Sequence, residues 1–179
     1  DNIFYSPNMI FNYNKDVSGA HIFAYHVADP GRYGVVEFDK QNQIISIEEK
    51  PKKPKSNYAI PGLYIFDSSV TSFVQDLKPS LRGELEITDL LQKYLQANNL
   101  KVTKMDKGTA WLDTGTFSSL MQASQFVQVL EKRQGLKVGC LEESAYKMGY
   151  INADSLRALG TKSLSSGYGK YLISLVDEN

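Results

Sequence analysis

The spacing of hydrophobic residues changes along this chain, and that change limits the folds open to it. Residues 20–27 are rich in β-forming residues and predict a buried strand. Farther on, Val70, Phe73 and Leu77 follow the spacing of one helix face, and Ile87, Leu90 and Leu91 begin a longer repeat of the same kind. Strands that alternate with helices predict an α/β architecture with a mixed sheet. In such sheets, ligands bind beyond the carboxyl ends of the strands.

Turn-forming and polar residues bound the other predicted elements. Residues 34–38 and 43–48 flank a short polar link, which predicts a hairpin, and Pro61 and Gly62 interrupt a strand at 58–66. The remaining expected elements are strands at 100–105 and 109–113 and helices at 116–133, 141–148, 153–159 and 163–176. On the first of these helices, the apolar side is expected to carry Phe117, Leu120, Met121 and Leu130. We therefore expect two domains, a sheet-bearing part at 1–134 and a helical appendage at 135–179.

Composition excludes several classes of protein. The 179 residues suffice for one core plus a small appendage. Twenty Lys and Arg balance twenty Asp and Glu, so the chain has no net positive charge to attract nucleic acid or an anionic membrane. The lone Cys140 excludes an intrachain disulfide, and there is no apolar run long enough to span a bilayer. We expect a cytoplasmic protein that binds neither nucleic acid nor a membrane.

Asp113 is a candidate metal ligand, because it follows a predicted strand and precedes Thr-Gly-Thr. Mg²⁺ prefers oxygen ligands and is usually held by one or two carboxylates together with substrate phosphates. The alternative is that Asp113 caps the helix that begins near Thr116. Considered alone, the four residues favour the cap, whereas Trp111 and the other candidate segments favour the ligand.

Four further residues could bind a phosphorylated ligand, and each has a purely structural alternative. Glu49 can accept bonds from two adjacent hydroxyls while Lys50 faces a phosphate, or the two form an exposed ion pair of little energetic value. Gly34 either lets a ligand approach the backbone or occupies a turn. Arg82 either binds phosphate in a bidentate manner or is a solvated loop cation.

Taken together, these segments resemble the glucose-1-phosphate thymidylyltransferases, which are sugar nucleotidyltransferases of the bacterial dTDP-rhamnose pathway. The resemblance extends over nearly the whole chain, and Arg82–Asp89 is its most specific motif. The segments that carry it are Asp1–Tyr5, Arg32–Asp39, Glu48–Pro51, Gly62–Tyr64, Arg82–Asp89, Trp111–Thr116, Glu131–Val138 and Gly167–Leu172. The resemblance implies a mixed, mostly parallel sheet of the Rossmann-like nucleotidyltransferase type.

The resemblance also implies a reaction and its participants. The phosphate of glucose 1-phosphate attacks the α-phosphorus of dTTP, which gives dTDP-glucose and pyrophosphate, with Mg²⁺ as the cofactor. Asp1 and Asp113 are implied as metal ligands, and Lys50 and Arg82 as contacts to the sugar phosphate. Residues implied to bind the sugar hydroxyls or to line the sugar pocket are Tyr33, Gly34, Glu49, Ile60, Tyr64 and Trp111.

In the helical part, the resemblance implies a second, regulatory nucleotide site and a role in assembly. The residues implied for that site are Lys137, Val138, Cys140 and Glu143. The family is typically tetrameric, so we expect a homo-oligomer. Residues 1–134 would then be the sugar-phosphate-binding and catalytic part, and residues 135–179 the assembly and regulatory part.

The family's glycine-rich nucleotide-binding segment is not found in this sequence. We expect that segment to precede Asp1, so that the chain is the C-terminal portion of a longer enzyme, truncated at the N-terminal side of its sheet and inactive alone. The alternative is a non-catalytic module that binds a sugar phosphate or nucleotide, or that serves assembly.

Overall fold

The computed structural model describes residues 2–6 and 18–177, which form two compact units at 1–116 and 117–179. The boundary between the units lies ahead of the long helix α3 (Phe117–Gln134), whereas the sequence placed it after residue 134. The functional division at that later position stays a prediction.

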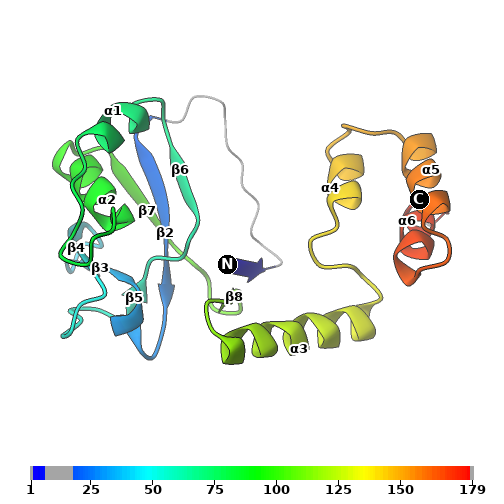
Figure 1. The fold of residues 1–179 in the computed structure, drawn as a ribbon, viewed down its shortest axis with the longest axis horizontal. Helices are drawn as coiled ribbons and strands as arrows, with labels where there is room; N and C mark the ends of the chain where they lie inside the picture. The colour runs from blue at the N-terminus through cyan, green and yellow to red at the C-terminus, as the bar shows by residue number, and fades with distance from the viewer. Residues whose placement is uncertain (1, 7–17, 178–179) are drawn as a thin grey trace. The chain divides into compact units, whose positions relative to one another are not determined.

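The first unit holds all the described strands and two of the α-helices (Figure 1). Its elements in chain order are β1 (Asn2–Tyr5), β2 (Ala20–His26), the short 3₁₀ helix η1 (Pro30–Arg32), β3 (Gly34–Phe38), β4 (Ile44–Glu49), β5 (Tyr58–Ala59), β6 (Tyr64–Phe66), α1 (Val70–Gln75), α2 (Ile87–Gln96), β7 (Leu100–Lys104) and β8 (Ala110–Asp113). The predicted strands and helices of this region are therefore confirmed, and the strand expected at 58–66 is divided at Pro61, as its proline required.

The sheet is mixed, as predicted, but its pairing is mainly antiparallel. Strand β2 pairs in parallel with β7 and antiparallel with β5 and β6, while β3 pairs antiparallel with β4 and β5. The expectation of mostly parallel pairing is therefore wrong for the described strands. Connection length explains the β3–β4 pair, because strands joined by a few residues must run in opposite directions. It does not explain the β2–β6 pair, which is antiparallel although three strands lie between its members in the chain.

The hairpin of β3 and β4 brings the first predicted site residues together. Asp39 closes its turn, since Oδ1 accepts the N–H groups of Gln41 and Gln43, each at 2.8 Å. Asn42 adopts a left-handed conformation with φ 62°, which Asn tolerates better than most residues. The resulting register sets Gly34 opposite Glu49.

Helix α2 buries its apolar face against strands β4 and β7. Leu91 is fully buried, and each such side chain contributes about 1.5–3 kcal/mol relative to exposure. Its cluster is completed by Ile22, Ala24, Val36, Ile47 and Ile60. The helix ends at Gln96, and Asn98 follows it in a left-handed conformation with φ 54°, its N–H bonded back to Leu95 O. Ser69 is the N-cap residue of α1, and Asp67 accepts the Ser69 N–H at 3.1 Å.

The second unit consists of helices, which confirms the helical appendage predicted there. After α3 come α4 (Leu141–Lys147), α5 (Ala153–Lys162) and α6 (Gly167–Asp177), whose core contains Cys140, Leu156 and Leu172. The apolar side expected for α3 is not buried, because Phe117, Leu120 and Met121 are each half exposed or more. The small Ala123 is the buried residue of that helix. Among the helices of the described residues, none is long and apolar enough to cross a membrane.

Candidate functional site

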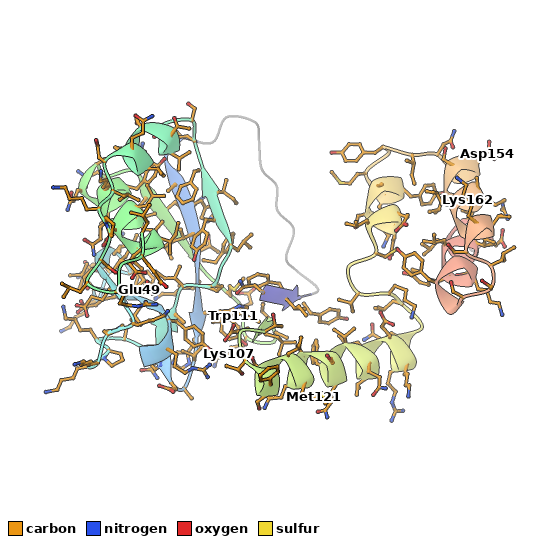
Figure 2. The ribbon with its side chains drawn as sticks, viewed as in Figure 1. Glu49, Lys107, Trp111, Met121, Asp154 and Lys162 are labelled. Atoms are coloured by element: carbon orange, nitrogen blue, oxygen red, sulfur yellow. The ribbon has the colours of Figure 1, made fainter. Side chains whose placement is uncertain are left out.

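Glu49 is the centre of the candidate site, at the end of β4 (Figure 2). Its Oε2 accepts a hydrogen bond of 3.1 Å from the hydroxyl of Thr88. Its Oε1 lies 3.8 Å from both Lys50 Nζ and Arg82 Nη1. The structure therefore brings three predicted residues together, and the cations approach Glu49 at ion-pair distance rather than hydrogen-bond distance. Glu49 retains capacity for a ligand hydroxyl, because a carboxylate has about four acceptor positions.

The absence of a side chain at Gly34 leaves room for the Glu49 carboxylate and for Thr88. A Cβ atom at position 34 would lie 2.9 Å from the Thr88 methyl carbon, 3.5 Å from Glu49 Oε2 and 3.7 Å from Ile60 Cδ1. The first distance is too short for a normal contact, so the glycine is required by its surroundings. Its backbone O also accepts the N–H of Ile60 at 2.8 Å, which fixes Ile60 beside the site. Gly34 lies in strand β3 rather than in a turn, and the atoms that crowd its Cβ position belong to the protein, so approach of a ligand to its backbone stays a prediction.

Thr88 is a site residue that the sequence analysis missed. It lies in the first turn of α2 and is only 1% exposed. A buried hydroxyl needs a hydrogen-bond partner, and Glu49 supplies it. The signal was present as a polar residue on an otherwise apolar helix face, since Thr88, Leu91 and Leu95 share a helical spacing.

Tyr64, on β6, interacts electrostatically with the same carboxylate. Burial raises the pKa of its hydroxyl to about 12, and the negative charge of Glu49 adds to the rise. The hydroxyl is therefore neutral at physiological pH and can donate a hydrogen bond. Its electrostatic interaction with Glu49 supports the predicted grouping of Tyr64, Ile60 and Gly34 around one carboxylate.

Trp111 and Tyr33 form a second, aromatic part of the site. Trp111 lies on β8, and its ring centroid is 4.9 Å from that of Tyr33. Burial raises the pKa of Tyr33, the neighbouring Arg32 opposes this rise, and Asp113 adds to it. Asn2 holds the indole in place, because its Oδ1 accepts the Trp111 Nε1–H at 2.7 Å. Sequence reasoning did not single out Asn2, although the motif Asp1–Tyr5 contains it.

Asp113 ends β8 and has two partners. Its Oδ1 accepts the Gly115 N–H at 3.0 Å, and its Oδ2 lies 3.8 Å from Arg32 Nη2. The first contact closes a local turn at Gly115, ahead of the helix that begins at Phe117, and is therefore not the helix cap of the alternative interpretation. The carboxylate oxygens belong to the donor class that Mg²⁺ prefers, so Asp113 fits the expected role. Asp1 lies outside the described residues, and within those residues no three His, Cys, Asp or Glu side chains cluster to hold a metal.

The predicted regulatory residues gather in the second unit around three carboxylates, those of Glu131, Glu142 and Glu143. Lys137 Nζ lies 2.5 Å from Glu131 Oε2, and the backbone N–H of Val138 donates to Glu131 Oε1 at 3.2 Å. The hydrogen bond from Lys137 is the main cause that lowers the pKa of Glu131. Glu131 was known from the sequence only as the start of a family motif.

Cys140 and Glu143 contact two tyrosines of helix α6. Cys140 Sγ lies 3.2 Å from the hydroxyl of Tyr168, which also donates to Glu142. Glu143 accepts bonds of 2.6 Å from both Lys147 and Tyr171. Burial alone would raise the pKa of Glu143, but these two bonds outweigh it and lower the pKa.

Tyr171 links the regulatory residues to each other. Burial, together with the bond to Glu143, raises the pKa of the Tyr171 hydroxyl to about 12, and the backbone of Lys137 also bonds to it. The structure thus brings Lys137, Cys140 and Glu143 near one another through Tyr168 and Tyr171. These tyrosines lie in the motif Gly167–Leu172, which was the sequence signal for them.

Comparison with known proteins identifies relatives of this chain. The sequence profile of the family described as nucleotidyl transferase matches residues 5–129. Relatives named glucose-1-phosphate thymidylyltransferase from Mycolicibacterium smegmatis and Xanthomonas campestris are 52% and 47% identical over 99% and 98% of this chain. The chain spans 62% and 60% of the length of these two relatives.

Two solved structures share the fold. A crystal structure assigned as a glucose-1-phosphate thymidylyltransferase from Bacillus anthracis, in complex with sucrose, is 46% identical, with a TM-score of 0.55 over 61% of this chain and 43% of that one. A UDP-glucose pyrophosphorylase complexed with UDP-glucose is 22% identical, with a TM-score of 0.54 over 60% of this chain and 43% of its own, which is a likeness of fold alone. The α/β fold and the profile match lead to one conclusion: the chain belongs to the nucleotidyl transferase family.

Proposed function

We propose that this chain is the sugar-phosphate-binding part of a glucose-1-phosphate thymidylyltransferase. The single observation that carries the proposal is Glu49, flanked by Gly34 and by the cations of Lys50 and Arg82. The named relatives support the choice of glucose 1-phosphate and dTTP as substrates and of dTDP-glucose as the product. A role in dTDP-rhamnose synthesis follows from the same resemblance.

The geometry suits a ligand that carries hydroxyls and a phosphate close together. Glu49 Oε1 has no hydrogen-bond partner within normal length among the described residues, so adjacent sugar hydroxyls can donate to it. Lys50 and Arg82 are each about half exposed, so both can move from the Glu49 carboxylate to the phosphate of a bound ligand. Arg82 can form two parallel bonds to phosphate oxygens, while Lys50 acts as a point charge.

The reaction needs no general base from the protein. An oxygen of the sugar phosphate is already an anion and attacks the α-phosphorus of dTTP. The new P–O bond forms as the bond to the leaving pyrophosphate breaks, so atoms and charge balance without a proton transfer. The contribution of Glu49, Lys50 and Arg82 is to align the nucleophile and to offset its charge.

Asp113 would hold Mg²⁺ together with Asp1, which lies outside the described residues. When bound, this metal would neutralise negative charge on the phosphates. We further propose that Lys137, Val138, Cys140 and Glu143 contribute to a second nucleotide site, and that the protein is a cytoplasmic homo-oligomer. These proposals rest on the resemblance and on the grouping of the four residues in the second unit.

The direct test is binding of glucose 1-phosphate to the 179-residue chain by calorimetry, with inorganic phosphate and glucose as comparison ligands. We expect glucose 1-phosphate to bind more tightly than either comparison ligand, because only it engages Glu49 and the cations at once. A pyrophosphate-release assay with dTTP, run on this chain and on the full-length relative from Mycolicibacterium smegmatis, separates binding from turnover. We expect turnover only in the relative, since this sequence has no glycine-rich phosphate loop. Equal affinity for all three ligands would refute the site.

A further inference from the structure

Arg82 lies in a tight loop that one serine organises. The hydroxyl of Ser80 accepts the backbone N–H of Arg82 at 3.1 Å and donates to Glu86 Oε1 at 2.8 Å. The backbone of Ser80 closes the loop, because its N–H bonds to Glu84 O at 2.8 Å and its carbonyl accepts the Gly83 N–H at 2.9 Å. Gly83 has a φ of 79°, a conformation that suits glycine.

Three carboxylates surround the guanidinium of Arg82. Glu84 Oε2 lies 2.9 Å from Nη2, Glu86 Oε1 lies 3.5 Å from Nη1, and Glu49 Oε1 lies 3.8 Å from Nη1. The side chains differ sharply in exposure, at 64% for Glu84 against 10% for Glu86. The exposed pair with Glu84 is weakly stabilising at best, so Glu86 is the partner whose charge acts in a low-dielectric setting.

Glu86 is the one charged residue that is buried within the described part of the chain. Removing a carboxylate from water is costly unless it is paired, and an apolar residue at the start of α2 would avoid that cost. Glu86 is the N-cap residue of α2, yet its side chain makes no capping hydrogen bond. Its polar partners are Ser80 and Arg82, so the buried charge acts on the Arg82 loop.

We propose that Glu86, through Ser80, is a positioning residue that holds the guanidinium of Arg82 beside Glu49. One oxygen, Glu86 Oε1, contacts both the Ser80 hydroxyl and Arg82 Nη1. Because the same hydroxyl accepts the Arg82 N–H, Glu86 connects the backbone of the loop to the Arg82 guanidinium. The preorganised guanidinium then meets an incoming phosphate with less loss of side-chain freedom. The inference rests on the proposed function in that it takes the phosphate of glucose 1-phosphate as the ligand of Arg82.

The experiment compares Glu86→Gln with the matched control Glu84→Gln in the 179-residue chain. Both changes remove one carboxylate charge from Arg82 and preserve side-chain size. We expect Glu86→Gln to weaken glucose 1-phosphate binding about 10-fold and Glu84→Gln to change it less than about twofold. In an Arg82→Ala background, we expect Glu86→Gln to change the affinity less than about twofold, because a positioning residue has no effect without the group it positions.

A second measurement does not depend on the ligand. The Nε–Hε signal of Arg82 in a ¹H–¹⁵N NMR spectrum should broaden or shift in Glu86→Gln and in Ser80→Ala, and should stay in place in Glu84→Gln. Ser80→Ala also keeps the test available if Glu86→Gln fails to fold. Equal effects of the two Glu variants, or an Arg82 signal untouched by Glu86→Gln and Ser80→Ala, would overturn the inference. Failure of the unsubstituted chain to bind glucose 1-phosphate would instead overturn the proposed function, and the NMR signal would still decide the role of Glu86.

Discussion

The central carboxylates of the two units, Glu49 and Glu143, differ in how closely their partners approach them. In the first unit, Glu49 faces Lys50 and Arg82 at 3.8 Å and accepts one hydrogen bond, from Thr88. In the second unit, Glu143 accepts bonds of 2.6 Å from both Lys147 and Tyr171. Short charge-assisted bonds of this kind are about twice as strong as neutral ones. Glu49 is therefore loosely paired, and Glu143 is tightly paired.

The difference separates a carboxylate that can bind a ligand from one that already stabilises the fold. A sugar hydroxyl that donates to Glu49 gains a hydrogen bond without breaking one. A nucleotide that binds at Glu143 must offset the loss of a tyrosine or lysine bond, unless those partners move with it. At the predicted substrate site, Glu49 can therefore accept a ligand hydrogen bond directly. At the predicted regulatory site, Glu143 must first lose a hydrogen bond from Lys147 or Tyr171.

The largest expected effect comes from Glu49→Gln, which removes the loosely paired charge. Glucose 1-phosphate affinity should fall about 10- to 100-fold, since a hydrogen bond to a charged acceptor is worth about 1.5–3 kcal/mol. The matched control is Glu48→Gln, the preceding residue of β4, which pairs with Lys55 at 2.6 Å. Calorimetry of both variants checks the prediction, and a Glu49→Gln variant that binds as well as Glu48→Gln would show that Glu49 does not face the sugar.

Gly34→Ala should have the next largest effect, because the added methyl group enters the space in front of Glu49. Its Cβ would lie 2.9 Å from the Thr88 methyl carbon, so Thr88 must move and its bond to Glu49 must lengthen. We expect about a 10-fold loss of glucose 1-phosphate affinity, with about 1–3 kcal/mol lost from folding. The control in the second unit is Gly167→Ala, where an added Cβ meets nothing within 4 Å. Similar behaviour of the two variants would contradict the close packing inferred at position 34.

Tyr171→Phe tests the tightly paired carboxylate. Removing the hydroxyl leaves Glu143 paired with Lys147 and should cost about 1–2 kcal/mol of stability in the second unit. Hydrogen exchange of the α4–α6 amides reports on this unit alone. The exposed Tyr150 provides the control, since its change to Phe should leave exchange unaltered. Unchanged exchange in Tyr171→Phe would mean that the bond to Glu143 does not stabilise the unit.

The sequence singled out the charged residues of the family motifs and missed the neutral ones that support them. Glu49, Lys50 and Arg82 could be predicted because their charges suit a phosphorylated ligand, whereas Thr88 and Asn2 lie in the same motifs without a charge. Thr88 could not be paired with Glu49, since the bond joins positions 39 residues apart. In the same way, Asn2 bonds to Trp111 across 109 residues of chain. Such contacts depend on the register of the folded sheet, which no local pattern specifies.

The fold shows the same limit. β-forming residues, turn residues and helical spacing predicted most of the described strands and helices, although not β1, because each of these signals is local. They could not predict the direction of pairing, since the parallel β2–β7 pair and the antiparallel β2–β6 pair use the same strand residues. The exposure of Phe117 and Met121 on α3 was also missed, because a periodic apolar face does not reveal whether a neighbour covers it.

The smallest expected effect is a pH dependence that Tyr64 contributes to the first unit. Burial, reinforced by the charge of Glu49, raises the pKa of Tyr64 from 10.0 to about 12. Below pH 10 the hydroxyl is protonated in both the folded and the unfolded chain, so its stabilising contribution is complete. Between pH 10 and 12 the unfolded chain loses this proton first, and the contribution declines.

Trp111 is the only tryptophan, so its fluorescence reports unfolding of the first unit. From pH 9.5 to 10.5, the free energy of unfolding should fall less in Tyr64→Phe than in the unsubstituted chain. Tyr171, whose pKa is also about 12, serves as the contrast, because Tyr171→Phe should leave this fluorescence-detected slope unchanged if the two units titrate independently.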